Sequence, residues 1–301
     1  MASTEENRRA YRDLLFTTQG VEAYISGVIL FDETLRQAAT DGTPFAQLLT
    51  ERKILPGIKV DKGAKALAGF SGEKITEGLD GLRERLAEYR ELGAKFAKWR
   101  AVITIGDGTP TRFCLEANAH ALARYAALCQ EAGIVPIVEP EVLMDGSHVI
   151  DRCREVTAET LKRLYAALFD HGVHLEGSLL KPNMVISGKA CPQQASPEEI
   201  ARATVGCFRQ AVPAAVPGIV FLSGGQSAEE ATVNLNAINA LGKQPWALSF
   251  SYGRALQEHT LKAWQGQPAN AEAAQRAFHH RAACNSAARE GRYTQAMEAG
   301  G

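Results

Sequence analysis

Short apolar runs alternate with longer amphipathic segments along most of the chain, and this alternation restricts the fold more than any other feature. The short runs are rich in β-branched and aromatic residues, whereas the longer segments repeat apolar residues at helical spacing. Such alternation predicts βαβ units and a parallel sheet that is buried on both faces. The expected strands are residues 25–31, 56–60, 96–105, 134–140, 174–181, 218–223 and 246–252.

The chain is expected to form a single domain. Helical patterns occupy residues 79–93, 116–133, 158–172, 196–212, 227–242 and 269–290. Ser196 and Ser227 each precede a glutamate by three residues, which predicts a capping box at the start of both helices. Helix ends are predicted at Gly133, Gly172 and Gly242. Because no linker or change of composition interrupts this pattern, residues 1–301 are predicted to be one domain.

The composition argues against several classes of protein. The formal net charge is −1, which favours neither nucleic acid nor an anionic membrane as a partner. The amino-terminal segment is polar, and no apolar run approaches the ~18 residues that a membrane span requires. The six cysteines form no CxxC pair, so we expect reduced, buried thiols in a cytoplasmic protein.

Five charged residues lie within or directly after the predicted strands. They are Lys59, Lys98, Glu139, Glu141 and Lys181. An isolated buried charge is costly, so residues of both signs in such positions are expected to face one another. Since the carboxyl ends of the strands form the active face of parallel α/β folds, we predict that these side chains form an active site.

Lys181 is the strongest candidate for a nucleophile. It ends an apolar run and precedes Pro182, which favours an extended backbone. A lysine amine is nucleophilic only when it is neutral, and burial together with a nearby cation such as Lys98 lowers its pKa toward neutrality. The alternative is a surface lysine at a strand end whose charged head reaches water.

Two glycine-containing loops follow the last two predicted strands and are candidates for binding phosphate. In both FLSGGQSAEE and SFSYGRAL, a serine and glycine lie between a strand and a helix. Backbone N–H groups in such turns, together with a helix N-terminus, bind anions. Alternatively, the glycines serve only to form turns. The candidate residues are Ser223, Gly224, Gly225, Ser251, Gly253 and Arg254.

The histidines do not suggest a metal site. His171 and His174 flank a predicted helix-to-strand turn, while His279 and His280 are neighbours on a predicted helix. None of these pairs has partner ligands at metal-binding spacing, so no metal site is expected.

Several long motifs resemble the class I fructose-bisphosphate aldolase family. They include GIKVDKGAKALAG, FAKWRAVI, GIVPIVEPE, LEGSLLKPNMV, FLSGGQSAEEA and PWALSFSYGRALQ, in one colinear order across nearly the whole chain. The resemblance implies a (β/α)8 barrel of the TIM type and reversible cleavage of fructose 1,6-bisphosphate through a lysine Schiff base. It further implies no metal or organic cofactor and assembly into a homo-oligomer.

The resemblance also implies roles for individual residues. Lys181 would form the Schiff base, and Glu139 would be the general acid/base with Glu141 beside it. Lys98 and Arg100 would contact the substrate and tune the site. The phosphosugar would be held by Lys59 at its distal phosphate, and at the ketose phosphate by Ser223, Gly224, Gly225, Ser251, Gly253 and Arg254.

One feature of the family pattern has no match in this chain. Family members begin with a strand that carries an active-site aspartate, whereas the first residues here match the segment after that strand. We therefore expect seven strands, with the first barrel strand absent from the chain. Two alternatives to a fully active aldolase follow: a truncated, catalytically impaired homologue, or a Schiff-base aldolase for another phosphosugar.

Overall fold

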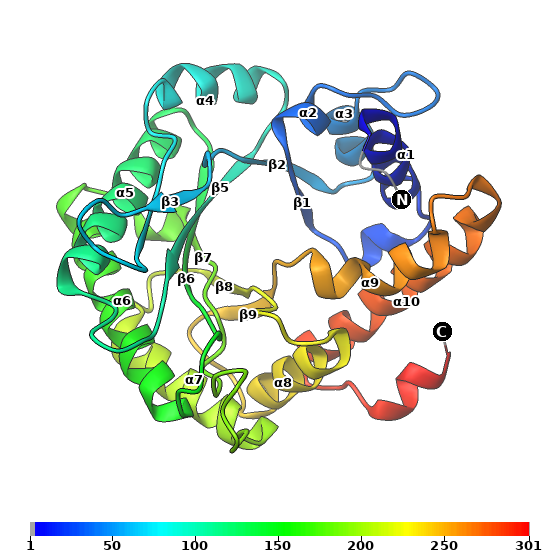
Figure 1. Ribbon diagram of the computed structural model, residues 1–301. Helices are drawn as coiled ribbons and strands as arrows, with labels where there is room; N and C mark the ends of the chain where they lie inside the picture. The colour runs from blue at the N-terminus through cyan, green and yellow to red at the C-terminus, as the bar shows by residue number, and fades with distance from the viewer. Residues whose placement is uncertain (1–3, 301) are drawn as a thin grey trace.

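Seven parallel strands form the central sheet within residues 4–300, the part of the chain that the computed structural model describes. The strand order is β1-β2-β5-β6-β7-β8-β9, and each strand pairs in parallel with the next. Figure 1 shows the strands curving into part of a barrel, with helices around the outside. The strands are β1 (Gly27–Leu30), β2 (Leu55–Lys59), β5 (Phe96–Ile103), β6 (Val135–Val142), β7 (Leu179–Leu180), β8 (Gly218–Phe221) and β9 (Ala247–Phe250).

The helices over residues 197–211, 228–240 and 271–289 lie within two residues of their predicted bounds. The helix over residues 150–170 begins before its predicted start at 158, and the helices over residues 5–16, 32–35 and 45–51 were not predicted. Both capping boxes are present, with the side chains of Ser196 and Ser227 accepting hydrogen bonds from backbone N–H groups three residues later. The helices are α1 (Glu5–Phe16), α2 (Asp32–Leu35), α3 (Phe45–Glu51), α4 (Leu82–Glu91), α5 (Arg112–Glu131), α6 (Ile150–Asp170), α7 (Pro197–Ala211), α8 (Ala228–Ala240), α9 (Arg254–Trp264) and α10 (Ala271–Arg289).

The predicted barrel-type α/β fold is confirmed, with two further differences among the strands. Strand β7 has only two residues because the 3₁₀ turn η2 (Leu175–Gly177) occupies the first half of the predicted segment. A two-stranded antiparallel hairpin, β3 (Ala64–Ala66) and β4 (Lys74–Thr76), was not predicted. Its strands have three residues each, which is too short to give a periodic signal.

The sheet is open between its first and last strands. Within the described residues, β1 and β9 are the two ends of the hydrogen-bonded order, and seven strands are present, as predicted. A cavity of about 440 Å³ lies between α1, β1 and α9. No described helix is both long and apolar enough to cross a membrane.

The hydrophobic core lies between the sheet and the surrounding helices. Ile58 on β2, Trp99 on β5 and Phe221 on β8 are fully buried, and all six cysteines are buried. Every connection between neighbouring strands is a parallel crossover, so the carboxyl ends of all strands lie at one edge of the sheet. Residues that follow the strands are thereby brought together at this edge.

Candidate active site

The charged residues predicted from the sequence lie on neighbouring strands. In the sheet register Lys59 on β2 is the partner of Lys98 on β5, and Arg100 on β5 is the partner of Glu139 on β6. Lys181 directly follows β7, and its N–H donates a hydrogen bond to the Val138 carbonyl of β6. Parallel pairing therefore brings together residues that are far apart in the sequence.

The side chains form a continuous row of alternating charge, which we call the charge row: Lys59, Asp61, Lys98, Glu139 and Lys181. The Asp61 carboxylate lies 2.7 Å from Lys59 Nζ and 3.4 Å from Lys98 Nζ. The Glu139 carboxylate lies 2.9 Å from Lys98 Nζ and 3.1 Å from Lys181 Nζ. All members except Lys59 are buried, so three cations and two anions leave one net positive charge in a poorly hydrated site.

A second ion pair lies beside the row. Arg100 Nη1 donates to Glu141 Oε2 at 2.9 Å, and the Glu141 side chain is mostly buried whereas Arg100 is about half exposed. Burial raises the pKa of Glu141 above its ordinary value, although the Arg100 guanidinium opposes this effect. A buried carboxyl that holds its proton more tightly is suited to acid/base work near neutral pH.

Lys181 has the environment that a nucleophilic amine requires. Burial is the main effect that lowers its pKa below the ordinary lysine value, and the charge of Lys98 acts in the same direction. The Glu139 carboxylate opposes them because it stabilises the charged ammonium. Burial prevails, so the neutral amine is populated at a lower pH than on an exposed lysine.

The two predicted phosphate loops are neighbours because β8 pairs with β9. The Ser251 N–H donates to the Phe221 carbonyl at 2.9 Å, which ties the start of one loop to the strand before the other. In the first loop Gly224 and Gly225 have φ angles of 59° and 84°, which favour glycine. A Cβ on Gly225 would also lie 2.9 Å from the Met144 sulfur, so a larger residue would require the Met144 side chain to move.

The first loop also lies beside the Lys181 segment. The N–H of Leu222, which precedes Ser223, donates to the Pro182 carbonyl at 3.1 Å. In the second loop Gly253 caps α9, and Arg254 opens that helix. Both residues line the cavity between α1, β1 and α9, which contains none of the charge row among its described lining residues. The charge row, where the buried ionisable groups converge, is therefore the candidate site that we propose for the chemistry.

Comparison with known proteins points to one family. A sequence model of the family described as fructose-bisphosphate aldolase class-I matches residues 1–301. A probable class 1 fructose-bisphosphate aldolase of Xanthomonas campestris is 59% identical over 97% of this chain and 87% of its own length. The cytosolic fructose-bisphosphate aldolase 4 of Arabidopsis thaliana is 58% identical over 97% of this chain and 74% of its own length.

This chain belongs to the class I fructose-bisphosphate aldolase family. Solved structures agree: the fructose-bisphosphate aldolase of Plasmodium falciparum, in a complex with TRAP and a small-molecule inhibitor, superposes with a TM-score of 0.96. That aldolase is 51% identical in sequence, and the match covers 98% of this chain and 85% of the other. At this level of identity the shared fold of the two aldolases is beyond question.

The sequence analysis missed one member of the aldolase charge row, Asp61. It follows β2 by two residues and is 7% exposed, which makes it as buried as the predicted Lys98. Burial alone would raise its pKa, but the charge of Lys98 and the hydrogen bond from Lys59 together lower it. Its position two residues after Lys59, at the end of a strand, was the sequence feature that could have identified Asp61 as a site residue.

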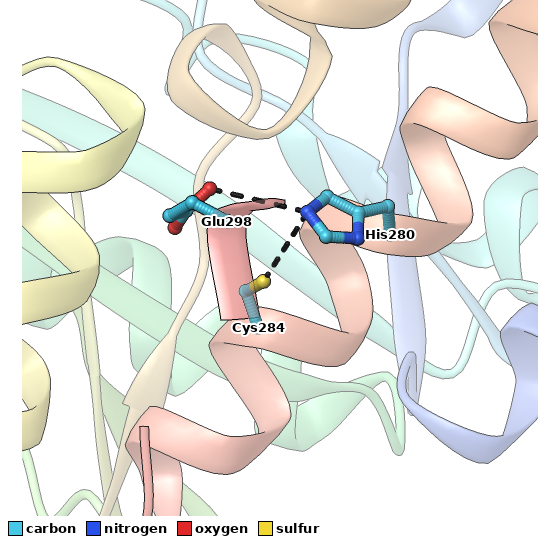
Figure 2. Close-up of side chains that lie close together, drawn as sticks. All are labelled: His280, Cys284 and Glu298. Carbon is cyan, nitrogen blue, oxygen red and sulfur yellow. Dashed lines mark hydrogen bonds and ion pairs between the residues drawn. The ribbon is translucent and has the colours of Figure 1, made fainter. Parts of the chain in front are cut away.

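A second cluster of titratable residues in this aldolase-family chain joins α10 to η4 (Gln295–Gly300). His280 Nε2 is 3.7 Å from Cys284 Sγ and 3.9 Å from Glu298 Oε2 (Figure 2). All three residue types bind metals, and their ligand atoms lie within 4.8 Å of one another. However, the buried Arg281 guanidinium donates to both Glu298 oxygens, at 2.9 and 2.5 Å. Because this carboxylate is already neutralised, we assign the cluster to fastening η4 (Gln295–Gly300) against α10.

Proposed function

We propose that this chain catalyses the reversible cleavage of fructose 1,6-bisphosphate to dihydroxyacetone phosphate and glyceraldehyde 3-phosphate through a Schiff base on Lys181. The observation that carries the proposal is the buried Lys181 amine, held 3.1 Å from the Glu139 carboxylate. Membership of the class I fructose-bisphosphate aldolase family supports the same reaction.

Imine formation requires a nucleophile and a group that carries protons. The neutral Lys181 amine adds to the substrate ketone carbon, C2, and Glu139 takes the proton that the amine gives up. Glu139 then delivers this proton to the C2 alkoxide, which gives the carbinolamine. A second proton, taken up from solvent, lets the C2 hydroxyl leave as water and gives the iminium. The contact of Glu139 with Lys181 suits both transfers, and such acid/base assistance contributes about 10²–10⁴-fold.

Carbon–carbon cleavage uses the iminium as an electron sink. Once a base takes the proton of the C4 hydroxyl, the electrons of the C3–C4 bond move into the iminium, and glyceraldehyde 3-phosphate leaves. Glu139 is unprotonated at this stage, and Glu141 lies two residues away on the same strand. The enamine that remains is protonated at C3, and water hydrolyses the imine to free dihydroxyacetone phosphate and the amine.

Cationic and backbone groups around the row are suited to hold the two phosphates. For the ketose phosphate we propose the loops after β8 and β9, supported by their adjacent positions and positive-φ glycines. For the distal phosphate and hydroxyls we propose Lys59 and Arg100, whose side chains are 26% and 47% exposed and therefore accessible to a ligand. The proposed phosphate-loop residues are Ser223, Gly224, Gly225, Ser251, Gly253 and Arg254.

The quaternary structure and location are also proposed from the family. The family resemblance supports a homo-oligomer, and the cytosolic Arabidopsis relative supports a cytoplasmic location. Light scattering at micromolar concentration measures the first directly, and a mass equal to one chain would contradict it.

Borohydride trapping tests the proposed function. Reduction in the presence of dihydroxyacetone phosphate should leave one covalent adduct on Lys181, located by peptide mass, together with turnover of fructose 1,6-bisphosphate. Lys181→Arg should form no adduct, whereas the exposed control Lys189→Arg should behave as the parent. An adduct on Lys98 or Lys59, or no adduct in folded protein, would overturn the assignment.

A further inference from the structure

Asp61 is a buried carboxylate of the charge row for which the proposed mechanism has no step. Its carboxylate is held by four donors, so its position is strongly restrained. Oδ1 accepts from Lys59 Nζ at 2.7 Å and from the Gly63 N–H at 3.2 Å. Oδ2 accepts from Lys98 Nζ at 3.4 Å and from the Arg100 N–H at 3.2 Å. A buried carboxylate with four donors has no lone pair directed at a ligand, which argues against direct contact with the substrate.

The contacts of Asp61 instead fix the two lysines on either side. Lys98 lies between two carboxylates, Asp61 and Glu139, and so cannot pair with Glu139 alone. Lys59 is bound twice, because its Nζ also donates to the Asp61 carbonyl at 2.8 Å. Asp61 thus fixes the direction of both amines and offsets part of the positive charge that Lys98 exerts on Lys181.

We propose that Asp61 is a positioning residue that holds Lys98 between two carboxylates and thereby sets the pH range over which the Lys181 amine reacts. This inference rests on the proposed Schiff-base function of Lys181. It assigns Asp61 no contact with the reacting atoms: its effect reaches Lys181 through Lys98 and Glu139.

Removing the Asp61 charge should change both the rate and its pH dependence. In Asp61→Asn the charge row gains one net positive charge, which disfavours the protonated ammonium of Lys181. The rate of borohydride trapping with dihydroxyacetone phosphate rises with pH, and we call this rise the pH limb. In Asp61→Asn the midpoint of the pH limb should move to lower pH, by on the order of one unit. At the pH optimum, kcat for fructose 1,6-bisphosphate should fall about 10²-fold because Lys98 and Glu139 lose their alignment.

A structural role alone predicts a different result. Glu73→Gln removes another buried carboxylate, one that accepts hydrogen bonds from Thr111 N and Oγ1 at 2.7 and 2.6 Å and lies outside the charge row. This control should lower the Tm but leave the pH limb in place. If Asp61→Asn likewise lowers the Tm without moving the limb, Asp61 is only structural and the inference is wrong.

Asp61→Glu gives a second test that does not depend on the folding of the amide variant. Asp61→Glu retains the negative charge but displaces the carboxylate. Its kcat should therefore fall, while the midpoint of the pH limb of borohydride trapping should match that of the parent. Parental kcat in this variant would overturn the inference. Failure of the parent itself to form an adduct on Lys181 would instead reject the proposed function, so the two failures are distinguishable.

Discussion

Lys181 shows how the environment of a single residue changes its chemistry. The same side chain on the surface is a hydrated ammonium, with a pKa of about 10.4 and no nucleophilic lone pair at neutral pH. Here the amine is buried and lies within an ion-pair distance of only one carboxylate among the described residues. Burial lowers its pKa further than Glu139 raises it, so the reactivity of the Lys181 amine depends on its buried position in the fold.

The first prediction follows from the lowered pKa of Lys181. Imine formation requires the neutral amine, whose fraction rises as pH increases through the pKa. Because this pKa lies below the ordinary value, the midpoint of the rising limb should lie below about pH 10.4. Trapping rates with dihydroxyacetone phosphate between pH 5 and pH 10 would measure it, and a limb at the ordinary lysine value would show that the amine is solvated.

Arg254 provides the second prediction at this scale. Arg254→Ala should raise the KM for fructose 1,6-bisphosphate about 10–150-fold, because a charge-assisted hydrogen bond is worth about 1.5–3 kcal/mol. Its Tm should change little, since Arg254 forms no ion pair with the described residues. The exposed Arg276, paired with Glu272 on α10, gives the matched control Arg276→Ala. Unchanged kinetics would remove Arg254 from the phosphate site.

At the residue scale, sequence reasoning predicted the charges of the site but not all of their pairing. Lys98, Glu139 and Lys181 stood out because charged residues are unusual in apolar strands. Asp61 did not, since it lies beyond β2 in a polar segment that reads as a loop. Its burial depends on β5, whose Arg100 N–H it accepts. A hydrogen-bond partner that is far away in the sequence, such as Arg100 for Asp61, cannot be identified from the local sequence pattern.

Elements were predicted best where periodicity is long and capping signals are strong. The 15 residues of α7 and the 13 of α8 both begin at their predicted serines. The length of strand β7 was overestimated. Only two of its residues pair with β6 and β8, and the extent of this pairing depends on those neighbouring strands and not on the local sequence. The short C-terminal turn η4 was not predicted, and it is fastened to α10 through Arg281.

The third prediction compares the two capping boxes. Ser196→Ala and Ser227→Ala should each lower the free energy of unfolding by ~1 kcal/mol, because each removes an N-cap hydrogen bond. Only Ser227 follows the proposed phosphate loop after β8, so only Ser227→Ala should also raise KM. Denaturant unfolding and steady-state kinetics on both variants test this. If Ser227→Ala and Ser196→Ala have the same KM, the start of α8 does not contribute to substrate binding.

At the scale of the whole molecule, the parallel topology produces the site, whereas the described strands leave the sheet open between β1 and β9. Four neighbouring strands, β2, β5, β6 and β7, deliver the charge row at one edge, and β8 and β9 deliver the loops beside it. The seven-strand count follows from the sequence. Within the described residues the opening lies between β1 and β9, as expected when one strand of an eight-stranded barrel is absent.

The fourth prediction concerns metals. Lys181 and Glu139 provide the nucleophile and the proton carrier of the proposed reaction, so fructose 1,6-bisphosphate cleavage should persist after prolonged treatment with EDTA. Steady-state rates before and after dialysis measure this. Loss of activity that zinc restores would contradict the Schiff-base mechanism and would direct attention to the His280 cluster on α10.

The last prediction concerns the attachment of the C-terminal segment. Glu298 accepts from Arg281 on α10 and from the Tyr293 hydroxyl, and Arg281 also pairs with Glu229 on α8. Burial would raise the pKa of Glu298, but the hydrogen bonds from Arg281 and Tyr293 lower it below its ordinary value of about 4.3. Its contribution to stability is therefore fully present above that value and is lost as pH falls through the lower folded-state pKa.

Glu298→Gln should lower the free energy of unfolding at pH 7 by about 1 kcal/mol, a modest value because the carboxylate is partly exposed to water. As pH falls below about 4, the variant and parent should converge, since the parent carboxylate is then protonated too. Glu272→Gln, in an exposed pair with Arg276, should differ little from the parent at either pH. A stability difference for Glu298→Gln that is independent of pH would mean that packing of η4, and not its charge, holds the C-terminal segment on α10.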